Sequence, residues 1–92
     1  MKKEFKVIAD LLPNNIRVLD VGCGDGSLMN FLQKEKNIEV RGLELNKDNV
    51  QKCIHKGLPV IQGDAETELH QFPKQSFDYV VLSQTLQAFY EP

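Results

Sequence analysis

The strongest constraint on this chain is an apolar run that contains an acidic residue and leads directly into a glycine-rich turn. Residues 18–21 read Val-Leu-Asp-Val, residues 22–26 read Gly-Cys-Gly-Asp-Gly, and a helical pattern of apolar residues starts at Ser27. A strand, a tight turn and a helix N-terminus in this order form a nucleotide-binding corner, because glycine lets the backbone turn sharply and approach a ligand that a Cβ would repel. The alternative is an ordinary turn between a strand and a helix, where glycine is also common.

The spacing of the glycines narrows the class of ligand. The turn reads G-x-G-x-G, and Ser27 stands where the dinucleotide fingerprint G-x-G-x-x-G has its last glycine. The chain therefore keeps the nucleotide-binding corner and departs from the dinucleotide pattern. A glycine-rich turn is a weak signal by itself, so the assignment depends on features further along the chain.

A second acidic residue lies at the end of the next apolar run. Residues 40–45 read Val-Arg-Gly-Leu-Glu-Leu, which places Glu44 eighteen residues after Gly26. In a doubly wound fold, an acid about 20 residues past the glycines lies at the tip of the second strand and accepts hydrogen bonds from ribose hydroxyls. Its two oxygens suit the two donors of a diol, whereas its charge would repel the 2′-phosphate of NADP. A solvated surface glutamate is the alternative interpretation.

The remaining apolar runs complete an alternation of strands and helices, which predicts an α/β fold with a parallel sheet. We expect strands at 16–21, 39–44, 59–62 and 77–82, and helices at 3–12, 26–36 and 47–56. Asn46 is a suitable N-cap for the last of these helices and Gly57 is a suitable terminator. Residues 66–72 are expected to be a short helix or irregular, and a further helix is expected to begin near Thr85.

The acid, the G-x-G-x-G turn and the Ser-Phe-Asp-x-Val-Val pattern of residues 76–81 resemble motif I and the fourth strand of the class I S-adenosylmethionine (SAM) methyltransferases. The resemblance implies a Rossmann-like, doubly wound parallel sheet with the strand order 3-2-1-4. The ligand crevice would then lie at the tips of strands one and four, where the strand order reverses. Residues 1–92 would form one SAM-binding domain with four strands, equivalent to the N-terminal half of the usual fold.

The same resemblance implies roles for individual residues. The Asp64 carboxylate would accept a hydrogen bond from the adenine amino group, and the backbone N–H of Ala65 would meet a ring nitrogen. A turn aspartate that follows a glycine is the alternative. Ser83 and Gln84 would line the methionine end of the cofactor. The expected cofactor-binding residues are Asp20, Gly22, Cys23, Gly24, Gly26, Glu44, Leu45, Asp64, Ala65 and Ser83.

A narrower resemblance rests on residues 18–26, on Gly-Leu-Glu at 42–44, and on Val-Val-Leu-Ser-Gln-Thr-Leu-Gln at 80–87 with the nearby Glu-Pro. These segments are similar to the methionine-biosynthesis MetW family. The resemblance implies a SAM-dependent methyltransferase, represented by its cofactor-binding portion and linked to methionine biosynthesis. Two alternatives stay open: a non-catalytic SAM-binding or interaction protein that partners a homoserine acyltransferase, and a Rossmann-like protein for another adenosine ligand.

Composition argues against several other classes. The formal net charge is −2 and there is no long basic run with interleaved aromatic residues, which disfavours nucleic-acid binding. The apolar runs are too short to span a membrane, and no apolar segment of a signal peptide follows the first lysines. Cys23 and Cys53 have no zinc spacing, so we expect no metal and a reducing cytoplasm. His55 and His70 are interpreted as surface or capping residues, and neither a catalytic base nor a methyl acceptor is identified.

The end of the fourth strand pattern leads to one further expectation. In the order 3-2-1-4, the far side of residues 77–82 has no partner strand among the four expected strands. Such an apolar edge presents unpaired N–H and C=O groups, and Asp78 alone is weak protection. We therefore expect self-association through this edge, as a symmetric dimer or by exchange of residues 83–92.

Overall fold

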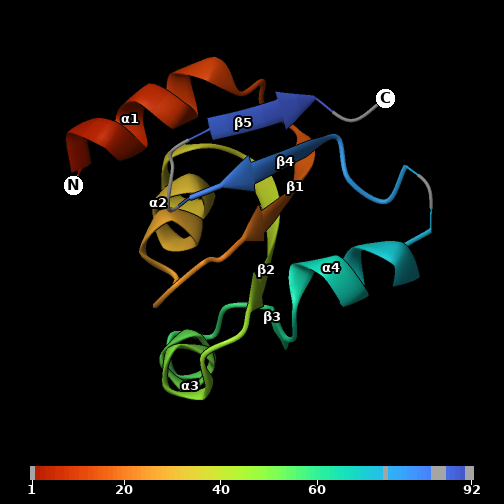
Figure 1. The fold of residues 1–92 in the computed structure, drawn as a ribbon. Helices are drawn as coiled ribbons and strands as arrows, with labels where there is room; N and C mark the ends of the chain where they lie inside the picture. The colour runs from red at the N-terminus through yellow and green to blue at the C-terminus, as the bar shows by residue number, and fades with distance from the viewer. Residues whose placement is uncertain (1, 74, 84–86, 91–92) are drawn as a thin grey trace.

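The computed structural model describes residues 2–73, 75–83 and 87–90, which form an open twisted sheet with helices on both faces (Figure 1). The elements follow one another in alternation, as the sequence pattern predicts. In chain order they are α1 Lys2–Leu11, β1 Ile16–Val21, α2 Ser27–Glu35, β2 Ile38–Glu44, α3 Lys47–His55, β3 Val60–Gln62, α4 Ala65–Glu68, the 3₁₀ turn η1 Leu69–Gln71, β4 Tyr79–Leu82 and β5 Gln87–Tyr90.

The sheet has the strand order β3-β2-β1-β4-β5. The first four strands are parallel, so the expected Rossmann-like order 3-2-1-4 is confirmed. β1 lies at the centre of this arrangement, with Val18 in register with Val40 of β2 on one side and with Tyr79 of β4 on the other. The carboxyl ends of β1, β2, β3 and β4 therefore lie at one edge of the sheet.

The expectation of a helix from near Thr85 is wrong for residues 87–90, which form β5 antiparallel to β4. Thr85 itself and the site candidate Gln84 lie outside the described residues. Local preference for a helix is overridden here by the row of N–H and C=O groups that β4 presents, since pairing satisfies all of them at once. The premise of self-association through an open β4 edge is therefore wrong as well, because β5 of the same chain already occupies that edge.

The two faces of the sheet are covered unequally. α1, α2 and α3 lie on one face, while α4 lies on the other (Figure 1). Because strand side chains alternate between faces, Val18, Val40 and Val81 project together toward the three-helix side. The buried apolar cluster on that side consists of Ile8, Ala9, Leu12, Val18, Cys23, Leu28, Met29, Leu32, Ile38, Val40, Cys53, Leu58 and Val81.

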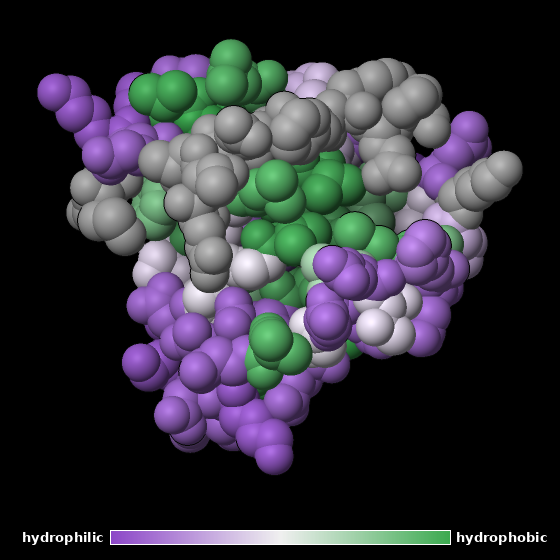
Figure 2. Space-filling model, viewed as in Figure 1, coloured by the Kyte–Doolittle hydropathy of each residue, from purple (hydrophilic) through white to green (hydrophobic). Residues whose placement is uncertain are grey.

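The surface combines apolar and polar areas. Hydrophobic side chains gather over the middle of the view in Figure 2, and hydrophilic ones cover α3. Among the described residues, no helix is long and apolar enough to cross a membrane.

The bounds of α3 follow from its two end residues. The Asn46 side chain accepts a hydrogen bond from the backbone N–H of Asn49 at 3.0 Å, which caps the helix at its start. At the other end Gly57 adopts φ +74°, the left-handed conformation that stops a helix. Asn46 and Gly57 therefore limit α3 to Lys47–His55, and β3 begins soon afterwards at Val60.

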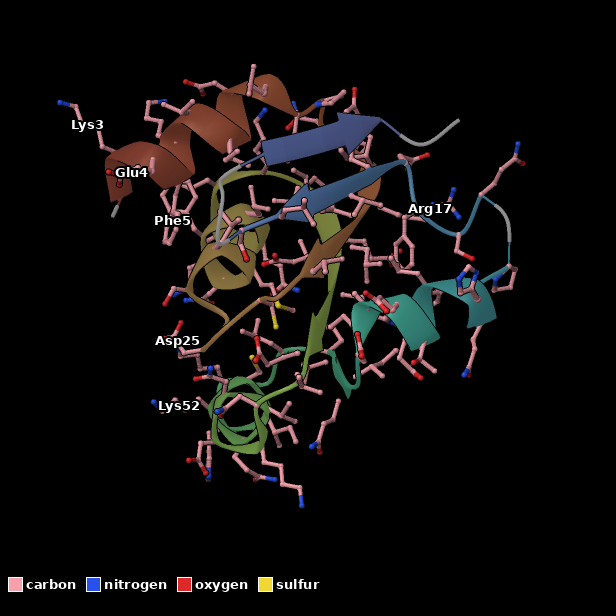
Figure 3. The ribbon with its side chains drawn as sticks, in the orientation of Figure 1. Lys3, Glu4, Phe5, Arg17, Asp25 and Lys52 are labelled. Carbon is pink, nitrogen blue, oxygen red and sulfur yellow. The ribbon has the colours of Figure 1, made fainter. Side chains whose placement is uncertain are left out.

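The start of β4 is fixed to β1 by reciprocal bonds. The Arg17 N–H donates to the Asp78 carboxylate at 2.8 Å, and the Asp78 N–H donates to the Arg17 carbonyl at 2.8 Å. The Arg17 guanidinium, labelled in Figure 3, also reaches the same carboxylate at 3.5 Å. These contacts set the register in which β4 lies against β1.

Candidate functional site

Residues expected from the sequence to bind a cofactor meet at the carboxyl edge of the sheet. Asp20 and the glycine turn, residues 22–26, come from the end of β1, and Glu44 ends β2. Ser83 follows β4, and its hydroxyl donates to the Gly22 carbonyl at 3.0 Å. The Gly22 N–H in turn donates to the Leu43 carbonyl of β2 at 2.8 Å. Three strands therefore converge on the first residue of the turn.

The shape of the glycine turn depends on two of its glycines. Gly26 has φ +85°, and a Cβ there would lie 2.5 Å from Leu58 Cδ1 and 3.0 Å from Cys53 Sγ. Gly24 has φ +59°, but a Cβ there would meet nothing within 4 Å. Gly26 thus allows close packing against α3 and the segment that follows it. Gly24 leaves open space beside the turn, which a ligand could use.

Asp25 ties the end of the turn to the start of α2 and to the end of α3, a role that the sequence analysis did not assign. Its carboxylate accepts hydrogen bonds from the Ser27 hydroxyl at 2.6 Å and the Ser27 N–H at 3.0 Å. Lys56, at the end of α3, donates to the Asp25 carbonyl at 2.9 Å. The Ser27 hydroxyl, followed by the Ser27 N–H and the Lys56 and Lys52 charges, lowers the pKa of Asp25. Figure 3 shows Asp25 in the turn, close to α3 and Lys52. An aspartate two residues before a serine is the turn signal that could have identified it.

Asp20 is the most unusual residue at this edge. Its side chain is fully buried, and its two carboxylate oxygens have no hydrogen-bond partner in the part of the chain that the structure describes. Burial raises the pKa of Asp20 to about 7; the nearby Ser83 hydroxyl acts against this rise and the Glu44 charge adds to it. Because buried polar groups in proteins are nearly always paired, a carboxylate in this state calls for a donor that the described residues do not supply.

Glu44 is also buried, with 6% of its surface exposed, but its carboxylate is hydrogen-bonded. One oxygen accepts from the Gly24 N–H at 2.8 Å and the other from the Asn46 N–H at 2.9 Å. The residue therefore holds the glycine turn against the end of β2. Each carboxylate oxygen can accept a further bond, so the group keeps acceptor capacity for a diol.

The other predicted residues lie along the same edge. Leu45 follows β2 and its side chain is exposed, with 68% of its surface accessible. Asp64 is exposed and caps α4, since one of its oxygens accepts from the Glu66 N–H at 3.0 Å. Ala65 is the first residue of α4. Cys23 lies beneath the turn, with 5% of its surface exposed.

The described residues contain no group of three or more histidine, cysteine or acidic side chains that could hold a metal ion. His55 and His70 are both exposed. The edge holds a buried carboxylate without a donor among the described residues, a second carboxylate with spare acceptor capacity, an open turn and an exposed apolar side chain. This combination fits an adenosine-containing ligand that carries a positive charge.

Comparison with known proteins identifies the family and the fold. Residues 2–92 match the family described as "Methionine biosynthesis protein MetW". The bifunctional methionine biosynthesis protein MetXA/MetW of Rhodopirellula baltica is 32% identical over 89 residues, which are 88% of this chain and 14% of that protein. The chain spans between 14% and 20% of the length of the curated relatives it matches.

Solved structures show the same fold. A SAM-dependent methyltransferase from Archaeoglobus fulgidus is 38% identical with a TM-score of 0.62, over 71% of this chain and 28% of its own. A SAM-dependent methyltransferase from Thiobacillus denitrificans, solved in complex with S-adenosyl-L-homocysteine, has a TM-score of 0.73 at 17% identity, over 89% of this chain and 36% of its own. The fold is therefore that of the SAM-dependent methyltransferases, and the match over residues 2–92 shows that the chain belongs to the MetW family.

Proposed function

We propose that the carboxyl edge of the sheet binds SAM and that the chain is the cofactor-binding part of a methyltransferase linked to methionine biosynthesis. The observation that carries the proposal is the buried carboxylate of Asp20, which has no partner among the described residues. SAM brings an ammonium group and a sulfonium, so it supplies both the donor and the positive charge that this carboxylate lacks. The family match supports the link to methionine biosynthesis.

Each element of the edge has a part in this proposal. Asp20 accepts a hydrogen bond from the ammonium of the methionine end, near Ser83. Glu44 accepts from the two ribose hydroxyls while it holds the Gly24 N–H. Leu45 lies against one face of the adenine, and Asp64 with Ala65 contacts its edge. Gly22, Cys23, Gly24 and Gly26 form the turn along which the cofactor lies.

The reaction places few demands on these residues. The sulfonium of SAM is an activated methyl donor, so the cofactor supplies the chemistry and the protein supplies binding and orientation. The buried carboxylates of Asp20 and Glu44 hold the ammonium and the ribose on either side of the sulfonium, which is how an in-line methyl transfer is aligned. No residue of this edge is assigned as a base for the methyl acceptor.

A second function is favoured by one observation. In the R. baltica relative, MetXA and MetW are parts of one protein. We propose as the alternative that the chain acts beside a homoserine acyltransferase as a SAM-binding or interaction partner. Sedimentation of the chain with that enzyme, with and without SAM, distinguishes the two: the partner role predicts a complex, and the methyltransferase role alone does not.

Isothermal titration with SAM, S-adenosylhomocysteine and NAD tests the cofactor assignment. We expect both sulfur cofactors to bind at least tenfold more tightly than NAD, because Ser27 replaces the last glycine of the dinucleotide fingerprint. SAM should bind more tightly than S-adenosylhomocysteine above pH 7, since only SAM carries the sulfonium charge near Asp20. Tighter binding of NAD than of either sulfur cofactor would overturn the assignment.

Gly24→Ala tests the open space beside the turn, with Gly57→Ala as its matched control. Both glycines have a left-handed φ and open space at the Cβ position, so both substitutions should lower the free energy of unfolding by about 1–2 kcal/mol. Only Gly24 lies in the proposed site, so only Gly24→Ala should weaken SAM binding, by at least tenfold in titration. Equal losses of affinity in the two variants would show that the turn does not contact the cofactor.

A further inference from the structure

Two cysteines that lie far apart in the sequence meet beneath the glycine turn. The sulfur atoms of Cys23, in the turn, and Cys53, in α3, are 3.9 Å apart, and both thiols are free. At this separation either thiol can donate a hydrogen bond to the other, and no covalent bond joins the two sulfur atoms.

The cysteine pair, Cys23 and Cys53, is bonded to the turn that it lies beneath. The Cys53 thiol donates to the Gly24 carbonyl at 3.4 Å, and the Cys23 thiol lies 3.8 Å from the same oxygen. Two glycines make room for the sulfur atoms: a Cβ on Gly42 would lie 2.7 Å from Cys23 Sγ, and a Cβ on Gly26 would lie 3.0 Å from Cys53 Sγ. Any change in the bonding of the pair is therefore transmitted to the backbone at Gly24.

We propose that Cys23 and Cys53 are a site of reversible oxidation, at which a hydroperoxide converts the two thiols into an intramolecular disulfide that ties the glycine turn to α3. In this proposal a small peroxide reacts first at Cys23, because that residue keeps 5% of its surface exposed and Cys53 is fully buried.

The reaction balances in two steps. The Cys23 sulfur attacks one oxygen of hydrogen peroxide, the O–O bond breaks, and a sulfenic acid and one water form. The Cys53 sulfur then attacks the Cys23 sulfur and displaces the second water, which leaves the S–S bond. Two thiols lose two electrons and two protons, and one peroxide is reduced to two waters.

The environment of the pair makes this oxidation slow. Burial raises the pKa of both thiols, with the Asp20 and Glu44 charges adding to the rise at Cys23 and the Lys56 charge opposing it at Cys53. Thiolate is the reactive form, so the pair resists brief exposure to peroxide and responds to sustained exposure. Once Cys23 is oxidised, the neighbouring thiol at 3.9 Å resolves the sulfenic acid before further oxidation.

The consequence for cofactor binding rests on the proposed function. A disulfide holds its sulfur atoms about 2.0 Å apart, so closure from 3.9 Å must move the two sulfur atoms that lie against the glycine turn. Closure also removes the thiol hydrogen that Cys53 donates to the Gly24 carbonyl. We expect the disulfide form to bind SAM at least tenfold more weakly, and bound SAM to oppose disulfide formation by the same factor at equilibrium.

The test uses the full chain, first without cofactor. The reduced protein is treated with hydrogen peroxide, its intact mass and free thiols are measured, and its peptides are mapped. The expected result is the loss of two hydrogens, a linked peptide pair containing Cys23 and Cys53, and full reversal by dithiothreitol. The proposal is overturned if both thiols stay free under conditions that oxidise the urea-unfolded chain, if mass rises by added oxygen alone, or if the disulfide joins two chains.

A variant and a titration complete the experiment. Cys53→Ser keeps a donor facing the Gly24 carbonyl and is expected to form no intramolecular disulfide. The oxidised wild-type chain is then titrated with SAM before and after reduction. Because mass and mapping need no cofactor, failure to form the disulfide is distinguishable from failure to bind SAM. If the fully cross-linked chain binds SAM as tightly as the reduced chain does, the claim that the disulfide weakens SAM binding is wrong.

Discussion

Asp20→Asn is expected to stabilise the fold above pH 7 while it weakens SAM binding by about ten- to a hundredfold. The rise of the Asp20 pKa from 3.8 to about 7 corresponds to about 4 kcal/mol of unfavourable burial of the charged form. Asparagine avoids this burial of charge, although its amide is also buried, and the net gain should be about 1–3 kcal/mol. The loss of affinity follows because a charge-assisted hydrogen bond to the ammonium is removed.

The stability change has a defined pH dependence. The folded-state pKa of Asp20 lies above its unfolded value, so the ionised carboxylate opposes folding, fully above about pH 7 and not at all below about pH 3.8. The advantage of Asp20→Asn should therefore shrink as the pH falls through this window. In the wild-type chain, SAM should bind more tightly as the pH rises toward 7, because its positive charges favour the ionised form.

Urea unfolding across this pH range and titration calorimetry with SAM measure the two effects. Asp48→Asn, at an exposed position in the first turn of α3, is the matched control and should change both quantities little. A destabilised Asp20→Asn variant above pH 7 would show that the carboxylate has a partner in the folded chain. Unchanged affinity would show that SAM does not reach it.

Glu44→Gln should lower both stability and affinity, in contrast to Asp20→Asn. The two Glu44 oxygens each accept a backbone N–H, from Gly24 and Asn46. Glutamine keeps one oxygen and turns an amide NH₂ toward the other donor, which leaves a buried N–H unpaired at a cost of about 1–3 kcal/mol. If the same carboxylate also binds the ribose, SAM affinity should fall by about ten- to a hundredfold.

Glu66→Gln is the control for this second variant. Glu66 is exposed in the first turn of α4, so its substitution should change the free energy of unfolding by less than about 0.5 kcal/mol. Thermal unfolding and SAM titration of the two variants give the comparison. If Glu44→Gln loses stability but keeps full SAM affinity, Glu44 supports the turn and does not bind the ribose. If the two variants have equal effects on SAM affinity, the ribose site is not at Glu44.

Much of the fold could be predicted because local signals and the global pattern agree. Asn46 and Gly57 fix the ends of α3 by capping and by a left-handed φ, and both signals are visible in the sequence. β5 could not be predicted in this way. Residues 87–90 form a strand because they pair with the edge of β4, and this tertiary contact cannot be read from their own sequence.

The sequence predicts which residues lie at the candidate site, but it does not predict which hydrogen bonds they form. The spacing of Glu44 after the glycines indicates the tip of β2, but the sequence does not show that its oxygens face the N–H groups of Gly24 and Asn46. Likewise, Cys53 could be expected to be buried in a helix, whereas its contact with Cys23 depends on how α3 lies against the turn. Backbone donors and packing angles become visible only in three dimensions.

The position of β1 between β2 and β4 has a consequence for the order of folding. β1 pairs with β2, which is close to it in the sequence, and Ile16 lies opposite Ile38. β1 also pairs with β4, which is distant in the sequence, and Val18 lies opposite Tyr79. Loop-closure entropy favours the first pairing over the second. Asp20 lies opposite Gly42 and Val81, so its hydration shell is fully removed only when β4 docks. The ionised carboxylate therefore opposes the last long-range step of assembly, and alkaline pH should speed unfolding more than it slows folding.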